Sequence, residues 1–314
     1  MDHDESEDRQ LRETVDRSRH GAPAAGSALR DRFSTDEIFQ RVTASAAEDI
    51  NRSAHLLFFS GLAAGTSVGA SFFGRALLTA AYPDDPVLGN LLYPIGFVII
   101  VLGGYQLFTE NTLTPVTLVL TRLASIPSLL RLWGIVILAN LVGAAGPALL
   151  FAHTGILEPA LAEAGRGFGE HALGVPWWDL FFKGTLAGGL VATMVWLVHA
   201  ARDTITRFWI AYVIMFMIPA GDLFHCIVGG FEMFYLVFLG VAGPLAAFWD
   251  FFVPVLFGNT VGGVFFVTLV NYGMTGERRF PDREGQLPEL TLREWLVGGR
   301  AERLRRDADR DDQP

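Results

Sequence analysis

The sequence predicts an all-α membrane protein with six transmembrane helices in two inverted three-helix repeats, the second and fifth helices being broken. Three observations predict this fold class: an apolar composition, charged residues gathered at the two ends of the chain, and a sequence repeat between its halves. Of the 314 residues, 51% are hydrophobic and 12% aromatic, and the mean hydropathy is +0.36. Soluble domains are less apolar than this, so we expect lipid to cover much of the surface.

The charged residues are sorted sharply along the chain. Residues 1–54 and 274–314 hold 17 of the 24 Lys and Arg residues and 22 of the 33 Asp and Glu residues. The net charge of -9 therefore describes two solvated ends, and no basic stripe with interleaved aromatic residues indicates a nucleic-acid surface. Nucleic acid is not an expected partner. The single cysteine, Cys226, excludes an internal disulfide.

This sorting of charge predicts four parts. They are a disordered cytoplasmic tail (1–33), an amphipathic cytoplasmic helix (34–54), a six-span channel domain (55–273) and a charged cytoplasmic tail that contains a further amphipathic helix (274–314). Ser34 and Glu37 have the spacing of a capping box, which favours a helix start at this point. The acidic start has no basic region followed by an apolar stretch, so no cleavable signal peptide is expected.

Six apolar segments are each long enough to cross a bilayer, which takes about 20 helical residues. They are 55–81, 88–121, 132–152, 180–201, 208–240 and 244–273. Basic residues of short loops favour the cytoplasmic side. Those of this chain fall on one side of the topology: Arg122, Arg131, Arg202 and Arg207. Both termini are therefore expected in the cytoplasm.

Two sequence matches relate the halves of the chain. In the second segment of each half, QLFT (106–109) matches DLFH (222–225), 116 positions later. In the third segments, ANLVGA (139–144) matches GNTVGG (258–263) at an offset of 119. Three spans per repeat is an odd number, so the halves must be inverted. Polar, glycine-containing interruptions in corresponding helices indicate a translocation site of broken helices near the membrane midplane.

Three motifs resemble those of the formate/nitrite transporter family: LFTENTL (107–113), LFHCI (223–227) and GNTVGG in the last span. The resemblance covers about residues 36–273. It implies a homopentamer of aquaporin-like six-span protomers in a bacterial-type inner membrane, with a solute channel through each protomer.

The resemblance also implies roles for single residues. His225 matches the central pore histidine of the family, Thr109 the loop threonine that hydrogen-bonds to it, and Phe108 a constriction residue. Leu107, beside them on the same loop, is expected to line the pore with them. Departures from the family pattern are equally specific: glycine stands at 188 and 229 where the family has asparagine, and Glu110 occupies a position that is usually small and uncharged.

His225 is the strongest candidate for the site. An ionisable side chain within a span is costly and indicates function, and imidazole changes charge near neutral pH. A bare carboxylate costs many kcal/mol in a dry constriction, whereas its conjugate acid costs a few; protonating a weak acid of pKa about 4 at pH 7 costs roughly 4 kcal/mol. Our hypothesis is that Phe108 and Phe224 form apolar gates, between which His225 offers a proton or a hydrogen bond. The alternatives are a neutral histidine that only bridges to Thr109, and phenylalanines that only pack.

The charged residues near the site leave the substrate open. Lys183, the only lysine, lies near the outer end of the fourth span, where it draws anions into a vestibule or extends to the interface. Glu110, Asp222 and Glu232 would repel anions if they faced the conduit ionised. We expect Asp222 to cap the half-helix that begins near His225.

Three further polar side chains have expected partners. Arg75 is expected to reach the interface or to pair with Asp84 or Asp85. Asn140 and Asn259, at repeat-related positions beside glycines, are expected to support the loops through hydrogen bonds.

These residues predict a channel or transporter for small monovalent anions or their conjugate weak acids, of the formate, nitrite or hydrosulfide type, passive or proton-linked. The alternatives are a neutral-solute or cation channel on the same scaffold, or a non-conducting scaffold or stress protein that acts through its tails. No catalytic motif stands in a suitable context, and the histidines have no metal-ligand spacing, so no enzymatic activity, cofactor or metal is expected. Besides the transported solute, the expected partners are membrane lipid and further copies of the chain.

Overall fold

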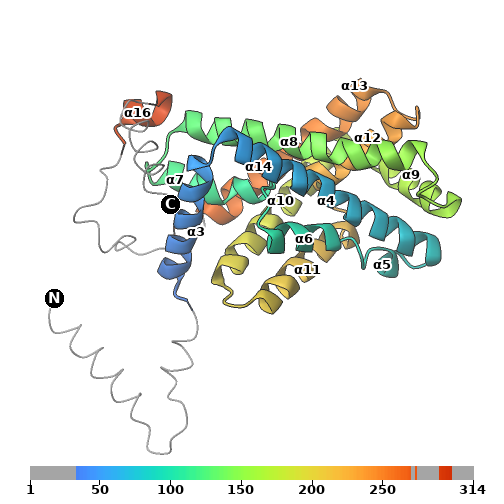
Figure 1. The fold of residues 1–314 in the computed structure, drawn as a ribbon, viewed down its shortest axis with the longest axis horizontal. Coiled ribbons are helices and arrows are strands. Elements are labelled where there is room, and N and C mark those ends of the chain that lie inside the picture. The colour runs from blue at the N-terminus through green and yellow to red at the C-terminus, as the bar shows by residue number, and fades with distance from the viewer. Residues whose placement is uncertain (1–32, 270–272, 274–289, 299–314) are drawn as a thin grey trace, which may run out of the picture.

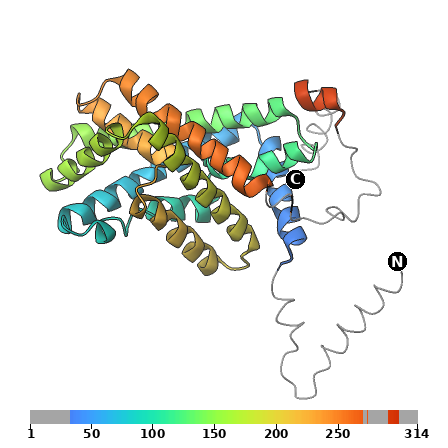
Figure 2. The same ribbon diagram turned by 180° about the vertical axis from the view of Figure 1, so that it is seen from behind.

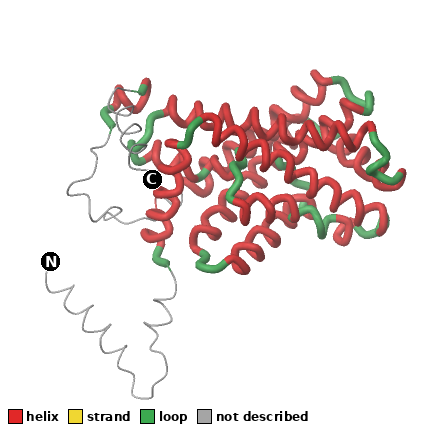
Figure 3. Tube along the Cα trace, viewed as in Figure 1, coloured by secondary structure: helices red, strands yellow, loops and turns green. Residues whose placement is uncertain are grey.

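The computed structural model describes residues 33–269, 273 and 290–298, and every regular element among them is a helix (Figure 3). The predicted disordered tail lies outside the described residues except for Phe33, as does most of 274–314.

The first repeat contains the predicted broken helix. Its elements are α4 (Ala54–Ala81), α6 (Ile95–Gly103), α7 (Thr114–Leu120) and α8 (Ile126–His153). Between α6 and α7 the chain leaves the helix at Gly104, which has a φ of 64° that favours glycine, and only a short 3₁₀ turn, η1 (Glu110–Thr112), interrupts the loop.

The second repeat has the same plan. Its elements are α10 (Trp177–Ala200), α11 (Thr204–Ala220), α12 (Cys226–Phe238), α13 (Pro244–Ala246), the π-helical η2 (Ala247–Phe252), α14 (Val253–Val261) and the π-helical η3 (Gly262–Leu269). Here α11 and α12 are the two halves of the broken fifth helix. Seen from behind, the orange helix from α13 to η3 runs along the bundle (Figure 2).

Hydropathy and length agree with this plan. Among the described residues, four helices are long and apolar enough to cross a membrane: α4, α8, α10 and the continuous run Pro244–Phe265. The second and fifth spans instead consist of two shorter helices each, as the repeat predicts.

Within the described part of the chain, four smaller helices lie outside the spans. They are α3 (Thr35–Asn51), α5 (Pro86–Gly89), α9 (Pro159–Leu173) and α16 (Leu292–Val297). The expected capping box is present in α3, where the Ser34 hydroxyl accepts from Glu37 N and the Glu37 carboxylate accepts from Ser34 N. Figure 1 shows α3 and α16 at one end of the bundle, the α3 end, and α5 and α9 at the other, the α9 end.

The helix α9 was not expected from the sequence. It packs through Gly165 and Gly169, whose missing side chains leave room for the ring of Phe72 and the side chain of Leu236. Leu161, Phe168 and Ala172 lie on the same face at helical spacing, so the sequence did carry the signal of an amphipathic helix.

Glycines also set the contact between long helices in both repeats. A methyl group at Gly65 would collide with the backbone of Asn140, and one at Gly188 would collide with the backbone of Asn259. Gly188 is therefore the close-packing mate of Gly65 in the inverted repeat, and no asparagine side chain fits at that position. Such small residues let helix backbones approach closely in membranes.

Candidate functional site

The two broken-helix loops meet in the middle of the bundle. The Oγ1 atom of Thr109 lies 2.7 Å from Nε2 of His225, and both side chains are buried. The structure thus brings together the two residues that the sequence singles out as a pair. The ring of Phe97 stands edge-on to the imidazole at a centroid distance of 4.9 Å.

The backbone of α12 fixes the orientation of His225. Its Nδ1 atom accepts from the backbone N–H groups of Ile227 and Val228, at 3.3 Å each, so His225 is the N-cap of α12. A ring nitrogen that accepts two N–H groups carries no proton, so in the neutral ring Nε2 carries it and donates to Thr109. The expectation that Asp222 caps this helix is wrong, because His225 occupies that position.

One asparagine per repeat holds each loop. The Nδ2 group of Asn140 donates to the carbonyls of Gly61 and Gln106, and its Oδ1 accepts from Phe108 N. Asn259 makes the same three bonds in the second repeat, as its Nδ2 donates to two carbonyls and its Oδ1 accepts from a backbone N–H. These partners are Gly184 O, Phe224 O and Cys226 N.

These bonds correct the register of the repeat. They equate Gln106 with Phe224 and Phe108 with Cys226, which are 118 positions apart. The QLFT and DLFH match, at 116, is therefore two residues out of structural register. Thr109 and His225 are therefore in contact across the pseudo-twofold axis, but they are not equivalent positions of the two repeats.

A narrow cavity lies at the α9 end of the Thr109–His225 contact; we call it the outer cavity. The space open to the centre of a water molecule is about 20 Å³, room for roughly one water. Phe224, His225 and Gly229 border it. A methyl group at Gly229 would collide with the ring of Phe251, so this ring takes the space that a side chain at 229 would need.

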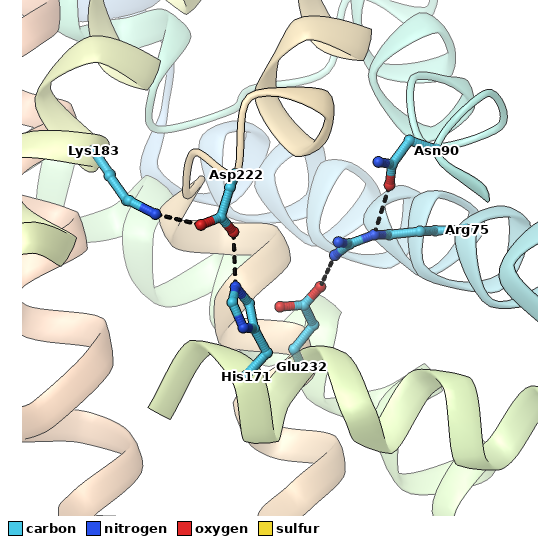
Figure 4. Close-up of polar contacts among 6 residues, drawn as sticks. All are labelled: Arg75, Asn90, His171, Lys183, Asp222 and Glu232. Atoms are coloured by element: carbon cyan, nitrogen blue, oxygen red, sulfur yellow. Dashed lines mark hydrogen bonds and ion pairs between the residues drawn. The ribbon is translucent and has the colours of Figure 1, made fainter. Parts of the chain in front are cut away.

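Two ion-pair groups surround the outer cavity (Figure 4). In the first, Arg75 donates to the buried Glu232 at 3.1 Å and to Asn90 at 3.0 Å. The guanidinium also lies 3.9 Å from the ring centroid of Phe168. The expectation that Arg75 reaches the interface or pairs with Asp84 or Asp85 is wrong, because a carboxylate buried on α12 requires a cation beside it.

The second group is centred on Asp222. Its carboxylate pairs with Lys183 and, at 2.8 Å, with Nε2 of His171 (Figure 4). Asp222 has a φ of 51°, a left-handed conformation that aspartate tolerates better than most residues. Lys183 lies 5.6 Å from the ring centroid of Phe224. The lysine thus stands beside the outer cavity with its charge balanced by Asp222.

A wider cavity, the inner cavity, lies at the α3 end. About 240 Å³ is open to the centre of a water molecule. Three arginines and two acids are among the residues that border it: Arg41, Arg52, Arg207, Asp49 and Glu110. The cavity therefore has an excess of positive charge.

Two polar atoms of the inner cavity stand out. Glu110 borders the cavity, and its Oε1 is covered and has no hydrogen-bond partner among the described residues; the same is true of Nε of Arg207. The sequence did not show whether Glu110 faces the conduit. In the structure Glu110, one residue after Thr109, borders the inner cavity.

Asp49 joins α3 to the site loop, a link that the sequence analysis missed. Its carboxylate accepts from Nε2 of Gln106 at 2.7 Å, and Oε1 of Gln106 accepts from Asn111 at 2.9 Å. Burial raises the pKa of Asp49 to about 6, against the opposing effect of nearby Arg52. The signal was available, since Asp49 follows Val42 and Ala46 at helical spacing on the apolar face of α3.

Leu107 and Phe108 border neither of these two cavities. Both are buried, and the ring of Phe108 lies edge-on to Trp133 of α8 at a centroid distance of 5.7 Å. Of the two expected gating phenylalanines, Phe224 borders a cavity. A place for Leu107 and Phe108 in the narrow region between the cavities stays a prediction.

Two interrupted helices that meet at a buried hydrogen bond, with a cavity toward each end, define a multi-pass membrane transport protein. Residues 36–273 match the formate/nitrite transporter family, and the chain belongs to it. It is accordingly a transport protein and not an enzyme.

Relatives and solved structures agree with this membership. The inner membrane protein YfdC of Escherichia coli is 32% identical over 240 residues, which cover 75% of this chain and 77% of the relative. Formate channel FocA of Haemophilus influenzae is 25% identical, covering 60% of this chain and 68% of its own. An FNT family ion channel structure has a TM-score of 0.69 at 23% identity, covering 76% of this chain and 99% of that chain. A pentameric formate channel with formate bound has a TM-score of 0.61 at 22% identity, covering 70% and 96%.

Proposed function

We propose that the protein is an inner-membrane channel for small monovalent anions or their conjugate weak acids, such as formate, nitrite or hydrosulfide. The observation that carries this proposal is the 2.7 Å contact between Thr109 and His225, which joins two broken-helix loops between two cavities. Relatives named as formate channels support the substrate class. The E. coli relative named as an inner membrane protein supports the location, and both termini would then face the cytoplasm.

The proposed assembly is a homopentamer. A structure of the same fold is described as a pentameric formate channel. Large apolar side chains also stand exposed on several spans, including Leu138 on α8, Phe182 on α10 and Phe265 on η3. Lipid and neighbouring protomers would cover these faces.

The proposed roles follow from the contacts. Arginines of the inner cavity attract anions from the cytoplasm, and Phe224 narrows the path on the outer side. His225 presents its Nε2–H toward the centre, because its Nδ1 is engaged with the backbone of α12. Protonation at Nδ1 would break both of those bonds, so a neutral, hydrogen-bonding histidine is the favoured state. Asn140 and Asn259 keep the loops in place.

A flux experiment tests the proposal. The full chain is reconstituted in liposomes, and the uptake of formate, nitrite and hydrosulfide is compared with that of glycerol and potassium at pH 5 and pH 7. We expect anion or weak-acid uptake, with a strong loss in His225→Phe and little change in His153→Phe, which alters an exposed histidine at the end of α8. Absence of uptake of all three anions at both pH values contradicts the proposal.

A neutral-solute or cation channel is the second candidate. The observation that favours it is Glu110, whose carboxyl group borders the inner cavity and is absent from the ion pairs of the described residues. Uptake of glycerol or potassium without uptake of anions in the same experiment supports this alternative.

A further inference from the structure

Two arginines converge on the C-terminal end of α10 at the wall of the inner cavity. Arg41 of α3 donates from Nε to the carbonyl of His199 at 2.8 Å, and Arg207 of α11 donates from Nη2 to the carbonyl of Ala201 at 3.3 Å. The two carbonyls belong to residues two positions apart, and both cations are within electrostatic reach of the His199 ring. The two guanidinium groups therefore lie close together, and both border the cavity.

No carboxylate neutralises these two cations. Neither Arg41 nor Arg207 forms an ion pair within the described part of the chain, and the Asp49 carboxylate is paired with Arg52 instead. Glu110 also borders the cavity, but the wall keeps an excess of positive charge whether or not this carboxyl group is ionised. Like charges that are held side by side repel each other, and an anion bound between them would remove that repulsion.

The hydrogen-bond donors of both arginines are only partly used. A guanidinium group has five N–H donors in one plane, and each of these two groups gives one bond to a carbonyl. The Nε–H group of Arg207 is covered and has no acceptor among the described residues, which is rare for a covered donor. The 3.3 Å bond of the same side chain is long, so a stronger acceptor in the cavity would turn its planar fork toward itself.

His199 adds an acceptor at the same place. This residue borders the cavity, and its Nδ1 lies 2.8 Å from the carbonyl oxygen of Val195. A carbonyl oxygen only accepts, so Nδ1 carries the proton, and in the neutral ring Nε2 is an acceptor. The wall therefore combines guanidinium donors with an imidazole acceptor, which is the complement of an oxyanion that also has a hydroxyl group.

We propose that Arg41, Arg207 and His199 form a binding site for the doubly charged hydrogen phosphate ion. The guanidinium groups donate to its oxygens, with two parallel bonds from Arg207, and its P–OH group donates to Nε2 of His199. About 240 Å³ of the cavity is open to the centre of a water molecule, which is ample for this ion. A second charge makes the ion costly to desolvate, so it stays at this site and does not pass the contact between Thr109 and His225. Binding at this site does not depend on the channel function proposed above.

Titration of inorganic phosphate into the detergent-solubilised full chain measures the site directly. At pH 8, where phosphate is mostly doubly charged, and at constant ionic strength, we expect saturable binding of one phosphate per chain. Sulfate has the same charge and shape but no hydroxyl group. Because it loses one hydrogen bond, we expect it to bind about fivefold more weakly.

Variants of the three side chains test their roles. Arg41→Gln and Arg207→Gln each remove a charged donor, so we expect phosphate to bind about tenfold more weakly or worse. Arg207→Lys keeps the charge but loses the planar fork, so weaker binding is expected there as well; this variant serves if the glutamine variants do not fold. His199→Phe should remove the preference for phosphate over sulfate. The control is Arg166→Gln, an exposed arginine of α9, which should bind phosphate as the wild type does.

Wild-type affinity in folded Arg207→Gln or Arg207→Lys overturns the inference, and so does the absence of saturable phosphate binding by the wild type. Titration with and without phosphatidylglycerol in the micelles identifies the source of the phosphate group. If this lipid abolishes the binding of inorganic phosphate, a lipid head group occupies the site, which overturns the assignment to a soluble ion. If the wild type binds phosphate but takes up none of formate, nitrite and hydrosulfide, the phosphate site stands and the proposed channel function fails.

Discussion

The outer and inner cavities differ in how their charges are partnered. Around the narrow outer cavity, Glu232 is paired with Arg75, and Asp222 is paired with Lys183 and His171. The wide inner cavity has three arginines and an unpaired Glu110. The outer acids are thus committed to ion pairs. On the inner side Asp49 is also paired, with Arg52, whereas Glu110 has no ion-pair partner among the described residues.

The difference also shows how one inverted repeat can serve two purposes. The loops are held by equivalent asparagines, so the two sides share a frame. Arg75, Lys183 and Glu232 lie on the spans, but on each side one partner comes from an added helix, His171 from α9 and Asp49 from α3. The frame is symmetric, and the added helices distinguish its two faces.

The largest effect is expected where three buried backbone groups depend on one side chain. In Asn259→Leu, the carbonyls of Gly184 and Phe224 and the N–H of Cys226 lose their partner. Each buried polar group left without a partner costs about 1–3 kcal/mol, so we expect a loss of about 3 kcal/mol or more in unfolding free energy. Thermal unfolding in detergent measures it, with Thr260→Val, on the same helix, as the control. Equal Tm values for the two variants would contradict the proposed frame.

The next effect concerns the inner cavity and depends on pH. Burial raises the pKa of Asp49 from 3.8 to about 6, so the folded protein holds a proton that the unfolded chain has lost. The resulting stabilisation is complete below about pH 3.8 and is lost as pH rises through about 6. Relative to Asp49→Asn, which does not titrate, the wild type should lose about 2.4 kcal/mol between pH 4 and pH 7.

Detergent-solubilised protein unfolded across that pH range provides the measurement. Glu48→Gln, at an exposed neighbouring position, should follow the wild-type profile. Parallel profiles for the wild type and Asp49→Asn would show that Asp49 is not buried against Gln106 as the structure places it.

These contacts show how far the sequence could lead. Hydropathy predicts the spans, and the repeat predicts the broken helices. The meeting of Thr109 with His225 was predicted by the resemblance of LFTENTL and LFHCI to family motifs. The partner of Arg75 could not be found this way. Glu232 is 157 positions away, whereas Asp84 and Asp85 are near in sequence but exposed, where an ion pair contributes little.

The sequence match gave the wrong register for the repeat, for a different reason. QLFT and DLFH resemble one another in side chains, but the loops are equivalent through backbone groups that bind Asn140 and Asn259. Backbone N–H and C=O groups do not depend on the side chain, so a pattern of residue types cannot show which of them are equivalent. Glu110 was recognisable as unusual, yet the sequence could not show whether it faces a cavity, because a loop has no periodicity that assigns a face.

A smaller effect is expected from the outer ion pair. Glu232→Gln keeps the shape of the side chain but leaves Arg75 with Asn90 and the Phe168 ring as its contacts. Removal of one partner of a fully buried pair costs about 3–5 kcal/mol; because these contacts remain, we expect about 2 kcal/mol here. The exposed pair Arg166–Glu170 is the matched comparison, and Glu170→Gln should cost under about 0.5 kcal/mol. Similar costs for both variants in thermal unfolding would show that burial does not distinguish the two pairs.

The smallest effect is on anion uptake. It tests whether the ion pairs around the outer cavity keep its positive charges from attracting anions. Asp222→Asn tolerates the same left-handed backbone and releases Lys183 from its carboxylate partner. The outer mouth then becomes more positive, so anion uptake from that side should rise a few-fold at low ionic strength and return toward wild type at high salt. Asp179→Asn makes the same change in net charge at an exposed position on the first turn of α10. An equal rise in both variants would mean that net charge alone matters, and a rise confined to Asp222→Asn would locate the effect at the group that Asp222 forms with Lys183 and His171.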